Sequence, residues 1–165
     1  MAHYFGEIDL STLDDATFEA LLAIAKLLLS ASKTILLPEF GNALQLALDS
    51  VDEQLHFKFA IDVNRKASKK KNKCSYQLRI EKHILLRLDI NCGRMHTNPP
   101  AFGGETIAGD HLHIFKEGYG VKVAYPVPTD FQSLQNLATT LRDFMIYSNV
   151  DNLEGFEFLE QTELI

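Results

Sequence analysis

Hydrophobic and polar residues alternate along three consecutive segments in the middle of the chain. Residues 56–66 read HFKFAIDVNRK, residues 74–82 read CSYQLRIEK, and residues 84–91 read ILLRLDIN. A period of two places the apolar side chains of a segment on one face of a strand and the polar side chains on the other. This alternation is typical of antiparallel strands with one buried and one open face, so it predicts a sheet in this region.

Two further strands are predicted at HLHIFK, residues 111–116, and at VKVAYPV, residues 121–127. The intervening EGYG predicts a hairpin, because glycine permits the positive φ angles of tight turns. Pro126 and Pro128 should end the second strand, since proline cannot donate to a ladder of hydrogen bonds. The predicted sheet therefore has about five strands.

Helical spacing is found before and after these strands. Apolar residues recur at three- and four-residue steps along residues 11–33, and a shorter stretch at residues 40–51 follows Pro38. The same spacing returns in residues 129–150, with Thr129 as the expected cap. We expect the acidic tail, residues 152–165, to pack at an edge.

Together these patterns predict a single α+β domain over residues 1–165: a curved antiparallel sheet of about five strands, with N-terminal and C-terminal helices packed on one face. Its 165 residues, 46% of them hydrophobic, suffice for one core. The chain shows no secretory signal and no apolar run of membrane-spanning length. Cys74 and Cys92 form no CxxC pattern, and we expect two reduced thiols in a cytoplasmic protein.

Charge is distributed unevenly along the chain. The net charge is −6, yet residues 56–125 hold 13 lysines and arginines against six acidic residues. A basic middle within an acidic protein can direct an anionic partner to one face, or acidic helices can neutralise it internally. The lysine-rich segment NRKASKKKNK, residues 64–73, is expected to be either a solvated loop or an arm that contacts phosphates.

The most specific stretch is GDHLHIFKEGYG, residues 109–120. His111 and His113 lie two positions apart and therefore on the same face of the predicted strand. If the strands pair in order, Arg79, Arg87 and Asp89 share that face. Arg94 and His96 come from the preceding loop and should lie at its edge.

Histidine and arginine side chains on one face suit a phosphodiester substrate, because guanidinium groups bind phosphate oxygens and imidazoles exchange protons near neutral pH. The leading hypothesis is a nucleic-acid-directed protein, specifically a small metal-independent endoribonuclease that needs no cofactor. His96 and either His111 or His113 would form the acid–base pair. The residues expected to bind RNA are Arg65, Lys69, Lys70, Lys71, Arg79, Arg87, Arg94 and Lys122, with Tyr119 or Tyr125 as a stacking surface.

Two other interpretations of the histidines stay open. His111 and His113 could chelate a divalent metal from one strand, with His96, His83 or an acidic residue completing the site. His-x-His followed by Glu117 resembles part of the first cupin motif, but no histidine follows His113 to complete that motif. Alternatively, the histidines are ordinary polar residues of an open strand face.

The segments FKFAIDVNRK, YQLR, LLRLDIN, NPP, GDHLHIFKEGYG and KVAYPV together resemble a family of small bacterial and phage proteins of unassigned activity. The resemblance covers roughly residues 55 to 128, and it implies a mobile-element setting. It adds a second functional hypothesis, a non-catalytic inhibitor of host defence that binds a protein–nucleic-acid complex. It implies no site residue.

Overall fold

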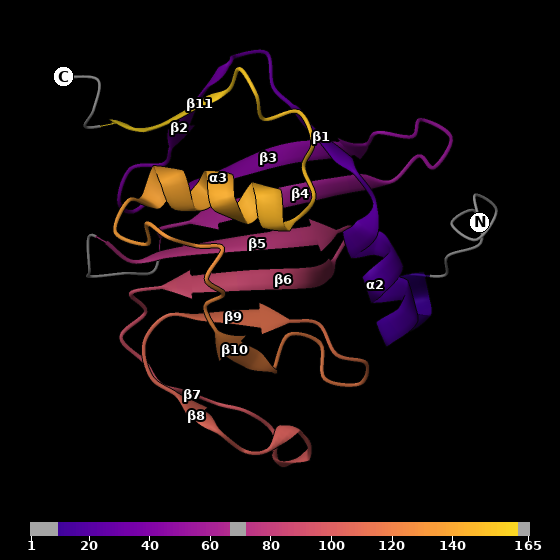
Figure 1. Cartoon of the computed structure of the whole chain (residues 1–165), viewed down its shortest axis with the longest axis vertical. Helices are drawn as coiled ribbons and strands as arrows, with labels where there is room; N and C mark the ends of the chain where they lie inside the picture. Colours follow the sequence, from indigo (N-terminus) through magenta and orange to yellow (C-terminus); the bar gives the residue numbers. More distant parts are fainter. Residues whose placement is uncertain (1–9, 67–71, 162–165) are drawn as a thin grey trace.

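The computed structural model describes residues 10–66 and 72–161. Its centre is a seven-stranded sheet with the strand order β1-β3-β4-β5-β6-β9-β10, in which every neighbouring pair is antiparallel (Figure 1). The strands are β1 (Lys26–Leu29), β3 (Ala43–Ser50), β4 (Lys58–Asn64), β5 (Cys74–Ile80), β6 (His83–Ile90), β9 (His111–Ile114) and β10 (Ala124–Pro126).

Smaller elements surround this sheet. The α-helices are α2 (Asp15–Ala23) and α3 (Leu137–Tyr147), and the 3-10 turns are η1 (Leu10–Thr12) and η2 (Pro100–Phe102). β2 (Thr34–Leu37) pairs in parallel with β11 (Glu157–Glu160), and β7 (His96–Thr97) pairs antiparallel with β8 (Thr106–Ile107). Neither α-helix in the described ranges has the length and apolar character needed to cross a bilayer.

The apolar face of the sheet is covered by α3 (Figure 1). The ring of Tyr76 on β5 lies 6.1 Å from that of Phe144, and the Tyr76 hydroxyl donates a hydrogen bond of 2.7 Å to the carbonyl of Leu137. Tyr76 therefore fixes the helix on the sheet through both apolar contact and a satisfied buried polar group. The buried side chains on this face of the middle strands are Phe59, Ile61, Val63, Tyr76, Leu78, Ile80, Leu86, Leu88, Ile90 and Leu112.

The opposite face carries the polar residues. The register of β6 and β9 sets Arg87 opposite His113 and Asp89 opposite His111. Because side chains alternate along a strand, all four lie on the face away from the apolar side chains of Leu88 and Leu112. The predicted order of the strands thus holds for the part of the sheet that carries the candidate site.

The α+β class and the antiparallel sheet are confirmed, but the first predicted helix is too long and the second is wrong. Only Asp15–Ala23 of residues 11–33 is an α-helix, and Lys26–Leu29 forms β1. Residues 40–51 contain β3 in place of the shorter helix. The leucines of this stretch fit both the two-residue period of a strand and the three- to four-residue spacing of a helix. In the structure Leu46 pairs with Ile61 and Leu48 with Phe59, which extends the buried sheet. Tertiary pairing here outweighs helix propensity.

The strand count and the helix placement also differ from the prediction. The large sheet has seven strands because β1 and β3 extend it. α2 does not share the face covered by α3: it lies beside the ends of β5 and β6 (Figure 1), where Phe18 contacts Phe115 with ring centroids 5.7 Å apart. The C-terminal helix begins at Leu137, capped by Asn136 and not by Thr129.

One charged side chain is enclosed in the fold. Lys26 in β1 is fully buried, and its Nζ donates to the carbonyls of Ile24 and Ser148 at 2.8 Å and of Leu22 at 3.2 Å. The ammonium group also lies 4.8 Å from the centre of the Phe59 ring. Burial lowers the pKa of Lys26 to about 7, because the enclosed site disfavours the charged form.

This pKa predicts a specific pH dependence of stability. Above pH 7 the folded chain releases a proton from Lys26 that the unfolded chain keeps, so the free energy of unfolding should rise with pH. We expect Lys26→Met to remove about 2 kcal/mol of the rise between pH 7 and pH 9, measured by urea unfolding at both values. Lys58→Met is the control, because the Lys58 side chain is 79% exposed. An unchanged pH dependence in Lys26→Met would contradict the assignment.

Candidate functional site

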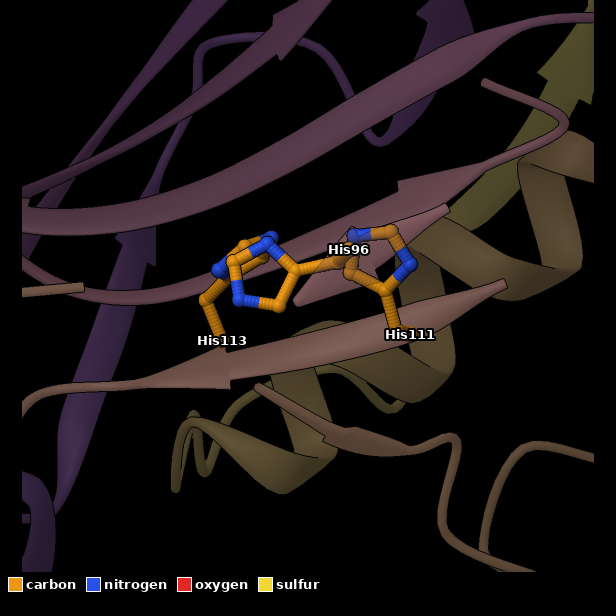
Figure 2. Close-up of side chains that lie close together, drawn as sticks. All are labelled: His96, His111 and His113. Carbon is orange, nitrogen blue, oxygen red and sulfur yellow. The ribbon is translucent and has the colours of Figure 1, made fainter. Parts of the chain in front are cut away.

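Three imidazoles gather on the polar face of the sheet (Figure 2). His111 and His113 rise from β9, and β7 brings His96 over them. The ring centroid of His96 lies 5.5 Å from that of His111 and 4.7 Å from that of His113. The centroids of the two rings on β9 are 4.8 Å apart. One ring nitrogen from each residue lies within 4.8 Å of the others. The structure therefore brings together the three histidines singled out in the sequence, here termed the histidine cluster.

Backbone carbonyls determine which nitrogen of each ring carries a proton. The carbonyl of Gly109 lies 2.8 Å from Nδ1 of His111, and that of Val121 lies 2.8 Å from Nδ1 of His113. The carbonyl of Lys122 lies 2.9 Å from Nε2 of His96. A carbonyl oxygen can only accept, so each of these nitrogens donates. In the neutral rings the lone pairs are consequently on Nε2 of His111, Nε2 of His113 and Nδ1 of His96.

Asp89 lies against two of these lone pairs. Its Oδ2 is 3.2 Å from Nε2 of His113 and 3.5 Å from Nε2 of His111. Arg87 contacts both groups, with Nε 3.3 Å from Asp89 Oδ2 and Nη2 3.1 Å from His113 Nε2. Nε2 of His113 can accept from Arg87 or donate to Asp89, but one nitrogen cannot do both in one protonation state.

The carboxyl group of Asp89 is ionised at neutral pH. Burial by itself would raise its pKa, but a hydrogen bond donated by Nε2 of His113 when that nitrogen carries a proton, the charge of Arg87 and a 3.0 Å hydrogen bond from the Ser75 hydroxyl outweigh burial. Together they lower the pKa of Asp89 to about 2. The ionised carboxylate of Asp89 therefore places a negative charge directly beside the imidazoles of His111 and His113.

Asn98 holds His96 in place from the loop between β7 and β8. Its amide forms two hydrogen bonds with the backbone of Ala124 on β10, at 2.9 Å to the carbonyl and 2.8 Å from the N–H. Nε2 of His96 lies 3.1 Å from Oδ1 of the same side chain. Asn98 is buried, so these bonds link the loop firmly to the edge of the sheet.

The histidine cluster lines a pocket of about 520 Å³, a volume within the usual range of small-molecule sites. Asp89 is the one carboxylate in its described wall. The cationic side chains that line it are Arg65, Lys73, Arg87 and Arg94. The pocket thus combines imidazoles with an excess of positive charge.

Other residues predicted for the site lie elsewhere. Arg79 forms an ion pair of 2.6 Å with Asp62 and is not among the residues lining the pocket. The ring of Tyr119 packs edge-on against Phe102, with centroids 4.9 Å apart. Lys122 contributes its backbone carbonyl to His96, while its side chain is exposed. Lys69, Lys70 and Lys71 lie outside the described residues.

The histidines on β9 are not open surface residues. His111 and His113 are 3% and 1% exposed, whereas the sequence pattern placed them on an open strand face. The 91–110 connection folds back over them, which a local period-two pattern does not reveal. Asp89 does follow from that pattern, since it lies two residues after Arg87. Asn98 has no sequence signal, because its partner Ala124 is distant in the chain.

The fold and the site define an α+β protein whose antiparallel sheet carries a histidine cluster in the wall of a cationic pocket. A family model matches residues 13–150, and the chain belongs to this family, which is described as a family of unknown function (DUF6978). The expectation of an uncharacterised family is thereby confirmed. Comparison with curated proteins and with solved structures gives no match.

Removal of the Asn98 side chain should test how His96 is positioned. We expect Asn98→Ala to lower the free energy of unfolding by about 2 kcal/mol, because the N–H and carbonyl of Ala124 lose their buried partner. In NMR spectra the imidazole signals of His96 should shift, while those of His83 should stay in place. Unchanged His96 signals would show that Asn98 does not position the ring.

Proposed function

We propose that the chain is a metal-dependent hydrolase in which His96, His111 and His113 bind one divalent transition-metal ion. One observation supports this proposal above the others: Nε2 of His111 and Nε2 of His113 both face Oδ2 of Asp89 while their Nδ1 atoms donate to carbonyls. When both rings are neutral, the lone pairs of the two Nε2 atoms face a carboxylate oxygen inside the protein, and these groups repel one another. A cation between these acceptors removes that repulsion.

A proton could take the place of the cation at one of the two rings, but it does not account for the third. Two adjacent imidazolium ions beside Arg87 would repel one another, because like charges within a few ångströms disfavour the charged forms. One ring nitrogen of His96 lies within 4.8 Å of a ring nitrogen of each of the other two histidines. A metal ion accepts three lone pairs at once, and imidazole is a common ligand of zinc, copper, iron and nickel.

The spacing of the nitrogens also favours an ion over an acid–base pair. Nitrogens bound to one zinc ion at about 2.0–2.1 Å are roughly 3.3 Å apart in a tetrahedral site, and small ring rotations bring atoms within 4.8 Å to this spacing. An acid and a base that serve opposite sides of a phosphorus atom must each reach a different oxygen, which requires a wider separation. Metal-independent cleavage is thus the second interpretation of the same cluster.

The carbonyl partners would act as outer supports for such an ion. A ligating histidine usually donates its other N–H to a carboxylate or carbonyl, which fixes the ring and raises its basicity. A bound divalent ion lowers the pKa of a coordinated water and so supplies a nucleophile at neutral pH. Asp89 would accept the hydrogen bond that orients this water. Arg87 would release Nε2 of His113 and keep its contact with Asp89.

Metal titration provides the direct test. We expect wild-type protein, purified without a histidine tag and treated with EDTA, to bind one Zn²⁺ per chain in isothermal titration calorimetry. His111→Ala and His96→Ala should each weaken binding by more than about 100-fold, since loss of an outer partner alone costs 10–100-fold. His96 is less buried than His111, so its variant keeps the test valid if His111→Ala misfolds.

His83→Ala is the matched control for these variants. His83 lies at the start of β6, outside the histidine cluster, and the variant should bind Zn²⁺ as the wild type does. Circular dichroism checks that each variant is folded. A wild-type chain that binds no Zn²⁺, Co²⁺, Ni²⁺ or Mn²⁺ would refute the proposal.

Asp89→Asn separates orientation of the water from binding of the metal. The amide keeps the shape of the side chain but loses its negative charge. We expect the variant to keep one Zn²⁺ per chain and to hydrolyse p-nitrophenyl acetate about 10–100-fold more slowly than wild type. Wild-type activity in Asp89→Asn would show that the carboxylate plays no part in the reaction.

A further inference from the structure

We infer that the substrate of this centre is an anionic phosphate ester, bound with its phosphate between the histidine cluster and the cationic wall of the pocket. The inference rests on the proposed function and adds the class of substrate. It comes from the charge, the position and the partners of the side chains around the pocket.

The pocket wall carries more positive charge than its own acid can neutralise. Arg65, Lys73, Arg87 and Arg94 line it, against the single carboxylate of Asp89 within the described wall. A bound divalent ion would add two further positive charges. A concave site with charges of one sign concentrates ligands of the opposite sign. The pocket therefore favours a negatively charged substrate over a neutral one.

Arg87 lies directly beside the histidine cluster. Its Nη2 lies 3.1 Å from Nε2 of His113, and Asp89 holds its Nε at 3.3 Å. The carboxylate of Asp89 therefore keeps the guanidinium group beside the histidine cluster, also when Nε2 of His113 binds an ion. Arginine presents paired N–H groups that match two oxygens of a phosphate, and it stabilises charge that develops there during reaction.

Arg94 and Lys73 contribute charges from the rim of the pocket. Within residues 10–66 and 72–161, no ion pair is recorded for either side chain, and Arg94 is exposed. Arg79 differs from both, because Asp62 already neutralises it away from the pocket. Arg94 and Lys73 are thus lining cations whose charge no carboxylate of the described residues neutralises.

The bonds and protons of phosphate-ester hydrolysis can be accounted for at this site with water as the other reactant. The oxygen of a water molecule attacks phosphorus, and the bond between phosphorus and the alcohol oxygen breaks. One proton of the water passes to solvent, and the departing oxygen takes a proton from solvent. The products are the free alcohol and the phosphate with one ester bond fewer, with no oxidant or reductant involved.

The experiment compares three chromogenic esters on the full-length, zinc-loaded chain: bis(p-nitrophenyl) phosphate, p-nitrophenyl phosphate and neutral p-nitrophenyl acetate. The measured quantity is kcat/KM for the better phosphate ester divided by kcat/KM for the acetate. Arg94→Ala and Lys73→Ala should each lower this ratio by about fivefold, because each removes a positive charge that attracts the anionic ester but not the neutral one. Lys58→Ala, with an exposed lysine paired to Asp49 outside the pocket, should leave this ratio unchanged. The first two esters distinguish a diester from a monoester.

A single-stranded RNA oligonucleotide, assayed in parallel, identifies the source of the phosphate ester. Its cleavage supports a polynucleotide substrate, and intact RNA together with a cleaved chromogenic phosphate ester supports a small phosphate ester.

Failure of the substrate inference can be told apart from failure of the metal proposal. If Zn²⁺ binds and the acetate is cleaved, but neither rim substitution changes the ratio, the phosphate ester is wrong and the metal centre stands. If phosphate-ester cleavage persists in EDTA and no metal binds, the metal centre is wrong and the acid–base pair replaces it. RNA binding with no ester cleaved overturns the phosphate-ester substrate and the hydrolase activity together, and it favours the non-catalytic inhibitor.

Discussion

The pairing of β6 with β9 determines almost everything at the candidate site. The register sets Arg87 opposite His113 and Asp89 opposite His111. It therefore places two pairs of charged or titratable side chains next to each other on one face of the sheet. A shift of one residue would turn these side chains into the core and expose Leu88 and Leu112. The buried leucines therefore fix the register, and the register fixes the chemistry. Stability of the core and geometry of the site have the same origin.

A second constraint is the cost of burying polar groups. Each member of the histidine cluster has a backbone carbonyl as partner for one ring nitrogen, and Asn98 satisfies both backbone groups of Ala124. These bonds compensate for lost hydration and also limit the rotation of the rings. The site is thus preorganised by the same hydrogen bonds that make its burial possible.

Much of the site could be predicted from the sequence because it depends on alternation. His111, His113, Arg87 and Asp89 fall on one face once the predicted strands pair in order, as strands that follow one another in a chain usually do. The burial of the histidines could not be predicted, since it depends on how the long 91–110 connection folds back. β1 and β3 were missed because leucine-rich stretches satisfy helical and strand periods at once, and only partners distant in sequence decide between them.

The separate origin of His96 has a further consequence. His111 and His113 belong to the sheet, whereas His96 belongs to the small hairpin of β7 and β8, which is attached to β10 through Asn98. An ion shared by all three would be a reversible cross-link between this hairpin and the sheet. Local opening of the hairpin would then require release of one ligand, so exchange of its backbone amides with solvent would become slower as the ion concentration rises. Occupancy of the centre would in this way set the lifetime of the closed loop.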